Sequence, residues 1–276
     1  MAHEGTTLKQ KVPAQEQDLP GLQKAMSPEP FDTSLETGSG PNHTPEWQAA
    51  RKEGTHYRRR VVSNVQPHGQ SRLTRSSSRV RGDVTIVHLP SEQKDADDTV
   101  AAIQREGRRA LSVAFDLEDF RGAHIIEPDF ASIDLDSVES TFRSNILQMF
   151  AVTKFALPHL ERGSSIINTT SVTTFRGSPT MVDYVSTKGA IVGFTRSLAK
   201  QLEPKGIRVN AVAPGPVHTP LQPASRSAEQ MEGFGEKSSI GRVGQPSEIA
   251  PTYVFLASAE AELYYGQIMH PYPLGD

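Results

Sequence analysis

From Asp83 onward, the chain alternates short apolar runs with amphipathic segments of helical length, and this alternation restricts the folds open to it. Residues 84–89 and 111–115 are nearly all apolar and have the length of strands, while residues 92–107 have a helical pattern. Strands that are apolar throughout are typical of parallel sheets covered on both faces. We therefore predict an α/β fold with a doubly wound parallel sheet, which continues through a long helix at residues 137–160.

The first 82 residues lack this alternation and divide into two segments. Residues 1–56 are rich in Pro, Gly, Gln, Glu and Thr, which predicts a disordered or surface-wrapping tail. Residues 57–82 form an atypical segment that is rich in Arg and Ser and contains one short apolar stretch, Val61 and Val62. The remaining residues, 83–276, are assigned to one domain, in keeping with the length of the chain.

Composition excludes several classes of function. The formal net charge of −3 argues against a general affinity for nucleic acid or for anionic membranes. The chain has no cysteine, and no cluster of His, Asp and Glu has the spacing of metal ligands, so we expect no disulfide, thiol nucleophile or metal site. There is neither a signal-peptide pattern nor an apolar run of about 18 residues, which favours a soluble, cytoplasmic protein.

The residues best suited to chemistry lie near the middle of the domain. Tyr184 and Lys188 are four residues apart in a predicted helix and therefore share one face of it. An ammonium group favours the phenolate form of a nearby phenol, and such a phenol can exchange a proton with an alcohol while a hydride moves. Ser171 follows the apolar strand of residues 165–168 and could hydrogen-bond the same oxygen. This set indicates the site of a carbonyl reductase or alcohol dehydrogenase.

The order of five elements resembles the short-chain dehydrogenase/reductase family: Asn145, Ser171, Tyr184, Lys188 and the pair Pro214–Gly215. The resemblance covers residues 83–270 and is strongest to glucose or ribitol dehydrogenase-like members that carry an N-terminal extension. It implies a Rossmann-like fold and the activity of an NAD(P)-dependent oxidoreductase that interconverts an alcohol and a carbonyl.

The resemblance also implies a role for each catalytic residue. Tyr184 would act as the general acid and base, and Ser171 would polarise the substrate carbonyl. Lys188 would favour the phenolate of Tyr184 and hydrogen-bond the ribose of the nicotinamide. Asn145 would hold a water molecule that connects Lys188 to solvent as a proton relay.

The implied cofactor is a nicotinamide dinucleotide. Asp116 would accept a hydrogen bond from its adenine amino group, and Gly215 would let the backbone approach the nicotinamide closely. No acidic residue stands beside His88, where the family selects its cofactor, which favours NADP, although Glu92 leaves NAD open. The residues expected to bind the cofactor are Asp116, Asn145, Tyr184, Lys188, Pro214, Gly215, Val217 and Thr219.

The expected partners are a small alcohol or carbonyl substrate and further copies of this chain. Helices at residues 137–160 and 184–203 correspond to those that form the family's usual four-helix interface. The resemblance therefore implies a homo-oligomer, either a tetramer or a dimer.

Two family elements are not recognisable: the glycine-rich loop after the first strand and the Asn-Asn-Ala-Gly of the fourth strand. We therefore expect a sheet that is incomplete at strands one and four, with residues 60–65 replacing one of them. NAD(P) should bind weakly or not at all, because the missing loop normally presents backbone N–H groups to the pyrophosphate. The C-terminus also departs from the family, since Pro271-Tyr272-Pro273-Leu274 stands where relatives usually carry a glycine pair.

Residues 57–82 stand where the glycine-rich loop is expected, and three interpretations of them remain open. The first is that these residues are the product of a shifted reading frame. The second is that they form a diverged loop, and the third is that they form an arm that binds RNA or phosphate. For the whole chain, the leading interpretation is an oxidoreductase whose activity is weakened by the missing loop. The alternatives are a catalytically impaired homologue that acts only as an oligomer partner, and the product of a defective gene.

Overall fold

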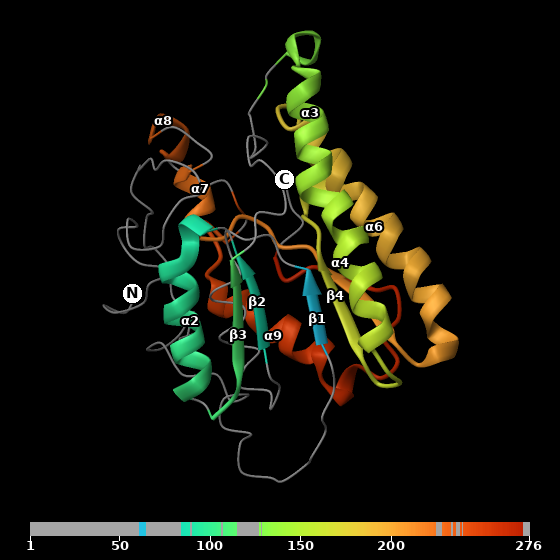
Figure 1. Ribbon diagram of the computed structural model, residues 1–276. Coiled ribbons are helices and arrows are strands. Elements are labelled where there is room, and N and C mark those ends of the chain that lie inside the picture. Colours follow the sequence, from blue (N-terminus) through green and yellow to red (C-terminus); the bar gives the residue numbers. More distant parts are fainter. Residues whose placement is uncertain are drawn as a thin grey trace, which may run out of the picture.

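The computed structural model describes residues 61–64, 84–88, 90–105, 107–114, 127, 129–224, 228–232, 234–235, 238 and 240–272. The tail predicted for residues 1–56 lies outside these ranges. The strands are parallel and form two sheets, one ordered β1-β4-β5-β6 and one ordered β2-β3 (Figure 1). They are β1 (Val61–Asn64), β2 (Val84–His88), β3 (Ala110–Ala114), β4 (Ser165–Thr169), β5 (Arg208–Val212) and β6 (Ile268–Met269).

The helices alternate with the strands along the chain. They are α2 (Gln93–Arg105), α3 (Leu135–Phe142), α4 (Gln148–Ala156), α5 (Thr173–Arg176), α6 (Val182–Leu202), α7 (Leu221–Ala224), α8 (Ala228–Met231) and α9 (Pro246–Ala257). Short 3-10 turns lie at Pro90–Glu92, Phe130–Ser132, Leu157–His159, Glu203–Lys205 and Ala259–Ala261. Of the helices in the described part of the chain, none is both long and apolar enough to cross a membrane.

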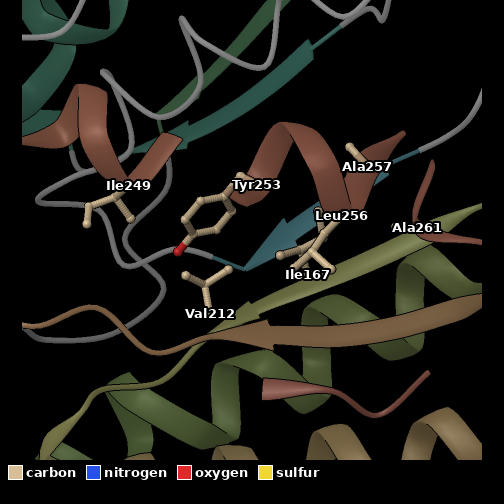
Figure 2. Close-up of a cluster of buried hydrophobic side chains, with 7 residues drawn as sticks. All are labelled: Ile167, Val212, Ile249, Tyr253, Leu256, Ala257 and Ala261. Atoms are coloured by element: carbon tan, nitrogen blue, oxygen red, sulfur yellow. The ribbon is translucent and has the colours of Figure 1, made fainter. Parts of the chain in front are cut away.

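The pair β4–β5 forms the centre of the larger sheet and is buried on both faces. Ile166 and Ile167 are successive residues of β4, so their side chains point to opposite faces. The cluster on the α9 side consists of Ile167, Val212, Ile249, Tyr253, Leu256, Ala257 and Ala261 (Figure 2). The cluster on the α6 side consists of Ile166, Ala199, Leu202, Ile207 and Val209. Helices therefore cover both faces of this sheet, and the predicted doubly wound fold is confirmed.

Arg208, the first residue of β5, joins the sheet to the C-terminal end of α9. Its side chain is buried, and its guanidinium donates hydrogen bonds to the carbonyl oxygens of Leu256 (2.7 Å) and Ser258 (3.0 Å). The last carbonyls of a helix lack partners within the helix, and a cation there is favoured by the helix dipole. The contact therefore satisfies the end of α9 and fixes its position against the sheet.

The long helix predicted for residues 137–160 contains a π-helical turn at its centre. It consists of α3, a π-helical turn at Arg143–Leu147 and α4, followed by the 3-10 turn Leu157–His159. The predicted long helix is therefore present, and the π-helical turn lies within it. A π turn inserts one extra residue into the helical path and is frequent at functional sites. The turn in this chain contains Asn145.

One of the two places expected for the missing family strands is filled. β1 pairs in parallel with β4, so residues 61–64 fill one of the two places, as predicted. Among the strands of the described residues, none joins β1 to β2. Residues 65–83 and 115–126, where the missing strands would fall, lie outside the described residues, so the incomplete sheet stays a prediction.

The burial predicted for β2 and β3 is only partly right. Ile86 and His88 are buried, but Thr85 is exposed and Leu111 of β3 is 58% exposed. Parallel strands become fully buried when neighbouring strands and helices surround them on all sides. Leu111 and Val113, the exposed apolar residues, share one face of β3, and that face stays in contact with water.

We expect Arg208→Met to lower the free energy of unfolding by about 2–4 kcal/mol, because it leaves the buried carbonyls of Leu256 and Ser258 with fewer donors. Urea denaturation measures the change. Arg196→Met, which replaces an exposed arginine of α6, is the matched control and should change stability by less than about 0.5 kcal/mol. Equal effects of the two substitutions would show that the contact with α9 is unimportant.

Candidate active site

The first two turns of α6 bring Tyr184 and Lys188 together. Lys188 Nζ lies 5.3 Å from the centroid of the Tyr184 ring, on the face that the four-residue spacing predicted. Tyr184 is half-buried, whereas Lys188 is only 1% exposed. The two groups are therefore neighbours in a region from which water is largely excluded.

Burial changes the protonation of Lys188. Desolvation disfavours the charged form of an amine and lowers the pKa of Lys188 to about 7. Its Nζ donates a long hydrogen bond of 3.4 Å to the backbone carbonyl of Thr169, at the end of β4. The Thr169 hydroxyl lies 2.7 Å from the hydroxyl of Tyr253 in α9. Thr169 thus connects the lysine to the core on the α9 side.

Asn145 is held against α6 by its side-chain amide. It is buried in the π-helical turn, and its Nδ2 donates to Thr187 Oγ1 at 2.9 Å. Thr187 Oγ1 in turn donates to the backbone carbonyl of Tyr184 at 2.7 Å. The chain of bonds places Asn145 next to the turn of α6 that carries Tyr184.

Ser171 lies two residues beyond the end of β4 and is buried. Its Oγ accepts hydrogen bonds from the backbone N–H of Thr173 (3.2 Å) and from Thr173 Oγ1 (2.9 Å). Both bonds use Ser171 as an acceptor, so its own hydroxyl hydrogen can still be donated to a ligand.

The loop of residues 214–219 follows β5 and runs beside the Ser171 loop. The backbone N–H of Val172 donates to the Pro214 carbonyl at 3.1 Å, which ties the two loops together. Val217 forms a parallel bridge with Gly244, and Thr219 is half-buried. The carboxyl ends of β4 and β5 therefore bring together Ser171, α6 and the Pro214–Gly215 loop, the edge at which open α/β sheets bind ligands.

Comparison with known proteins shows the origin of this arrangement. A family model described as enoyl-(acyl carrier protein) reductase matches residues 47–271. The chain belongs to the short-chain dehydrogenase/reductase family. It is 44% identical over 207 residues to glucose and ribitol dehydrogenase homolog 2 of Arabidopsis thaliana, a match that covers 65% of this chain and 72% of the relative.

Two further similarities concern a reductase and a solved structure. NADPH-dependent aldehyde reductase 1 of Arabidopsis thaliana is 54% identical over 140 residues, which is 50% of this chain and 49% of that protein. A short-chain dehydrogenase from Burkholderia cenocepacia, solved in complex with NADP, has a TM-score of 0.64 and 25% identity, and covers 77% of this chain and 95% of its own. The chain is thus an oxidoreductase of the short-chain dehydrogenase/reductase family.

The described residues fit the nicotinamide end of the family's cofactor. Lys188 supplies a buried amine, and Ser171, Tyr184 and the loop of residues 214–219 surround the same edge of the sheet. Asp116 and residues 65–82, where the adenine and pyrophosphate contacts were expected, lie outside the described residues. Nor do the described residues contain a group of three or more His, Cys, Asp and Glu that could hold a metal ion.

His88 and Glu92, which bear on the choice of cofactor, are both buried. His88 Nε2 lies 2.8 Å from the hydroxyl of Ser112 on β3. His88 is therefore held by the smaller sheet itself, and its imidazole already has one hydrogen-bonding neighbour.

Sequence reasoning missed three threonines of this short-chain dehydrogenase/reductase site. Thr169, Thr173 and Thr187 hydrogen-bond Lys188, Ser171 and Asn145 respectively. Each lies within a few residues of a predicted site residue or strand end, but its partner is set by the fold. Thr169 acts through its backbone carbonyl, whereas Thr173 and Thr187 use their hydroxyls.

We expect Lys188 to make stability depend on pH. An unfolded lysine titrates near pH 10.4, whereas folded Lys188 titrates at about 7, so between these values the unfolded chain binds more protons. The free energy of unfolding should therefore rise with pH in this range, by at most about 1.4 kcal/mol per pH unit.

Urea denaturation at pH 7 and pH 9.5 of wild type and Lys188→Met measures this contribution. Wild type should gain about 2–3 kcal/mol relative to Lys188→Met as the pH rises. Lys200→Met, which removes an exposed lysine of the same helix, should follow the wild type. Parallel pH dependences of Lys188→Met and wild type would contradict the assigned burial.

Proposed function

We propose that this chain interconverts an alcohol and a carbonyl with a nicotinamide cofactor. The observation that carries the proposal is the buried amine of Lys188 beside the ring of Tyr184. This pair lies at the carboxyl end of β4, next to the loops of Ser171 and Pro214. A lysine brought so close to a phenol is suited to control its proton transfer.

Tyr184 is the proposed acid and base. In the reducing direction its phenol gives a proton to the substrate oxygen as the carbonyl carbon receives a hydride, and in the oxidising direction it takes that proton back. Ser171 donates its hydroxyl hydrogen to the same oxygen and stabilises the negative charge that develops there. Its two bonds from Thr173 hold the Oγ in place for this role.

Lys188 and Asn145 support the proton transfer. With a pKa of about 7, Lys188 can be protonated or neutral at physiological pH, so it can receive and pass on a proton. Asn145 is proposed to hold a water molecule that links Lys188 to solvent. The bond from Asn145 to Thr187 fixes its side chain next to the turn of Tyr184.

A nicotinamide cofactor supplies or takes up the hydride. We propose that Lys188 and Tyr184 hydrogen-bond its ribose, that Pro214, Gly215, Val217 and Thr219 bind the carboxamide end, and that Asp116 binds the adenine. NADP is the proposed cofactor, with NAD as the alternative. The complex of the Burkholderia enzyme with NADP and the name of the NADPH-dependent Arabidopsis relative support this preference.

The chain is also proposed to form a homo-oligomer through α4 and α6. Large apolar side chains on the α4 segment are exposed, namely Leu147, Phe150 and Phe155. Phe150 packs on Phe194 of α6 with ring centroids 4.6 Å apart, so the two helices form one surface (Figure 1). Exposed apolar surface of this kind is typical of a contact between subunits.

Tyr184→Phe should lower kcat/KM by about 100- to 10,000-fold, because it removes the proton donor while keeping the ring. The rate is measured with NADPH and with NADH on a panel of aldehydes and sugar alcohols. Tyr265→Phe, in a half-buried tyrosine outside the site, is the matched control. A Tyr184→Phe variant with the wild-type rate would refute the assignment, and absence of turnover in wild type with either cofactor would refute the proposed function.

Phe155→Asp should shift the protein to a smaller assembly, because Phe155 is 72% exposed in the single chain and a carboxylate is costly in an apolar interface. Light scattering after size-exclusion chromatography measures the mass. Gln104→Asp on α2 adds the same charge at an exposed position away from this surface. A monomeric wild type, or an unchanged mass in Phe155→Asp, would contradict this interface.

A further inference from the structure

The ring of Tyr272, three residues beyond β6, fills a slot between two glycines. A Cβ placed on Gly215 would lie 2.2 Å from Cδ1, 2.4 Å from Cγ and 2.8 Å from Cε1 of this ring. A Cβ placed on Gly244 would lie 3.8 Å from Cδ2 and Cε2. No real Cβ approaches an atom as closely as the first three distances, so residue 215 must be glycine while the ring is in place.

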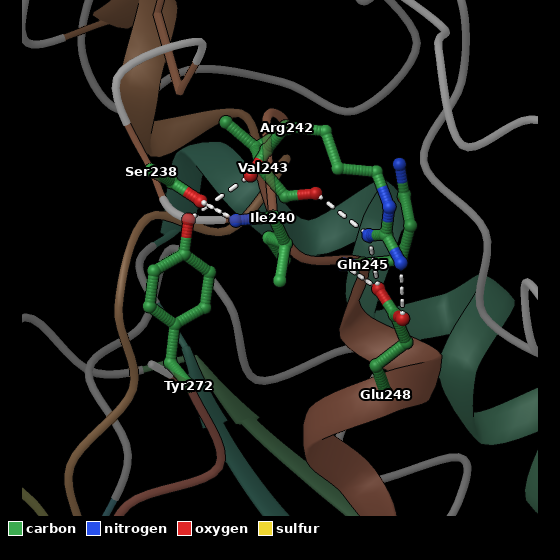
Figure 3. Close-up of polar contacts among 7 residues, drawn as sticks. All are labelled: Ser238, Ile240, Arg242, Val243, Gln245, Glu248 and Tyr272. Carbon is green, nitrogen blue, oxygen red and sulfur yellow. Dashed lines mark hydrogen bonds and ion pairs between the residues drawn. The ribbon is translucent and has the colours of Figure 1, made fainter. Parts of the chain in front are cut away.

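The hydroxyl of Tyr272 is anchored to the segment that leads into α9. It donates a hydrogen bond of 3.0 Å to the backbone carbonyl of Arg242 (Figure 3). The Arg242 guanidinium forms two hydrogen bonds of 2.8 Å with the Glu248 carboxylate, one to each oxygen. Glu248 also accepts from the backbone N–H of Gln245 at 2.8 Å and so belongs to the cap of α9. The tyrosine is therefore fixed to a rigid part of the fold.

The two segments that contact the ring are also bonded to each other. The Gly244 N–H donates to the Pro216 carbonyl at 2.8 Å, and the His218 N–H donates to the Gly244 carbonyl at 2.9 Å. These bonds hold residues 215–218 beside residues 242–245, and the Tyr272 ring lies against a glycine of each. We name this arrangement of the two segments and Tyr272 the C-terminal clasp.

We propose that Tyr272 is a positioning residue that holds the loop of residues 214–219 in the conformation that binds the nicotinamide end of the cofactor. The proposal rests on the proposed function. It follows from two facts: the loop carries Val217 and Thr219, and its Gly215 is pressed against a ring that is anchored elsewhere. A loop held by an anchored side chain loses less conformational freedom when a ligand binds.

The clasp also changes the role of Gly215. Close approach of the nicotinamide to this glycine was expected from the family resemblance, but the face that lacks a Cβ is covered by the Tyr272 ring. The cofactor cannot use that face while the clasp is closed. The contact proposed between Gly215 and the carboxamide end therefore has to come from the other side of its backbone.

Hydrogen exchange of single amides tests the clasp without any cofactor. Tyr272→Ala should raise the exchange rates of the His218 and Gly244 amides by about tenfold, since it removes the ring and its hydrogen bond. Tyr272→Phe keeps the ring and should give a smaller rise. The amide of Arg208, which bonds the Ser164 carbonyl within the core, should be unchanged. Unchanged exchange at His218 and Gly244 would overturn the proposal, whether or not the chain binds a cofactor.

A second substitution tests the contact with Gly215. Gly215→Ala should destabilise the wild type, because its Cβ collides with the ring, but should cost much less in the Tyr272→Ala background. Tyr265→Ala is the matched control background, in which Gly215→Ala should cost as much as in wild type. Equal costs in the Tyr272→Ala and wild-type backgrounds would overturn the proposal.

Calorimetric titration then tests the role in cofactor binding. Tyr272→Ala should weaken the binding of NADPH several-fold but leave that of 2′-phospho-ADP-ribose, which lacks the nicotinamide, unchanged. Equal losses for both ligands, or none for NADPH, would overturn the positioning role. If exchange rises in Tyr272→Ala but wild type binds neither ligand, the clasp stands and the proposed function fails.

Discussion

The hydrogen-bonded ladder between β4 and β5 is the contact on which the rest of the structure depends. Its two strands pair in parallel along their whole length and are buried between α6 and α9. Because parallel strands end at the same edge of a sheet, the ladder brings Ser171 and Pro214 to one place. The hydrogen bond from the Val172 N–H to the Pro214 carbonyl joins the two loops at that edge. The geometry of the site is therefore a product of the core, and α6, which carries Tyr184 and Lys188, packs on the same ladder.

Much of the fold could be predicted from the sequence, and the failures have physical causes. The strand at residues 165–168 and the helix after Tyr184 were predicted because their apolar patterns are long and regular. The π-helical turn around Asn145 was not predicted, since an apolar pattern does not separate a π turn from the α-helix on either side of it. The burial of β2 and β3 was overestimated because an apolar run does not show whether another element covers each face of the strand.

The candidate site, like the fold, was predicted only in part from the sequence. The four-residue spacing of Tyr184 and Lys188 predicted their shared face, because helical geometry is local. The burial that lowers the pKa of Lys188 to about 7 comes from packing and could not be predicted from spacing. The place of Tyr272 against Gly215 was also missed, although the departure of the C-terminus from the family pattern was visible. This contact joins two residues that are far apart in the sequence, so no local pattern could predict it.

The long-range pairing of β1 with β4 bears on the order in which the chain folds. Val61 and Ser165 pair across about 100 residues, whereas Ser165 and Arg208 pair across about 40. Closing the longer loop costs roughly 1 kcal/mol more in chain entropy, and only four residue pairs on one side of β4 repay it. The shorter loop therefore favours formation of the β4–β5 ladder before β1 docks on β4. Until β1 docks, the outer edge of β4 can accept a strand from another chain, so slow docking of β1 would expose the nascent protein to aggregation.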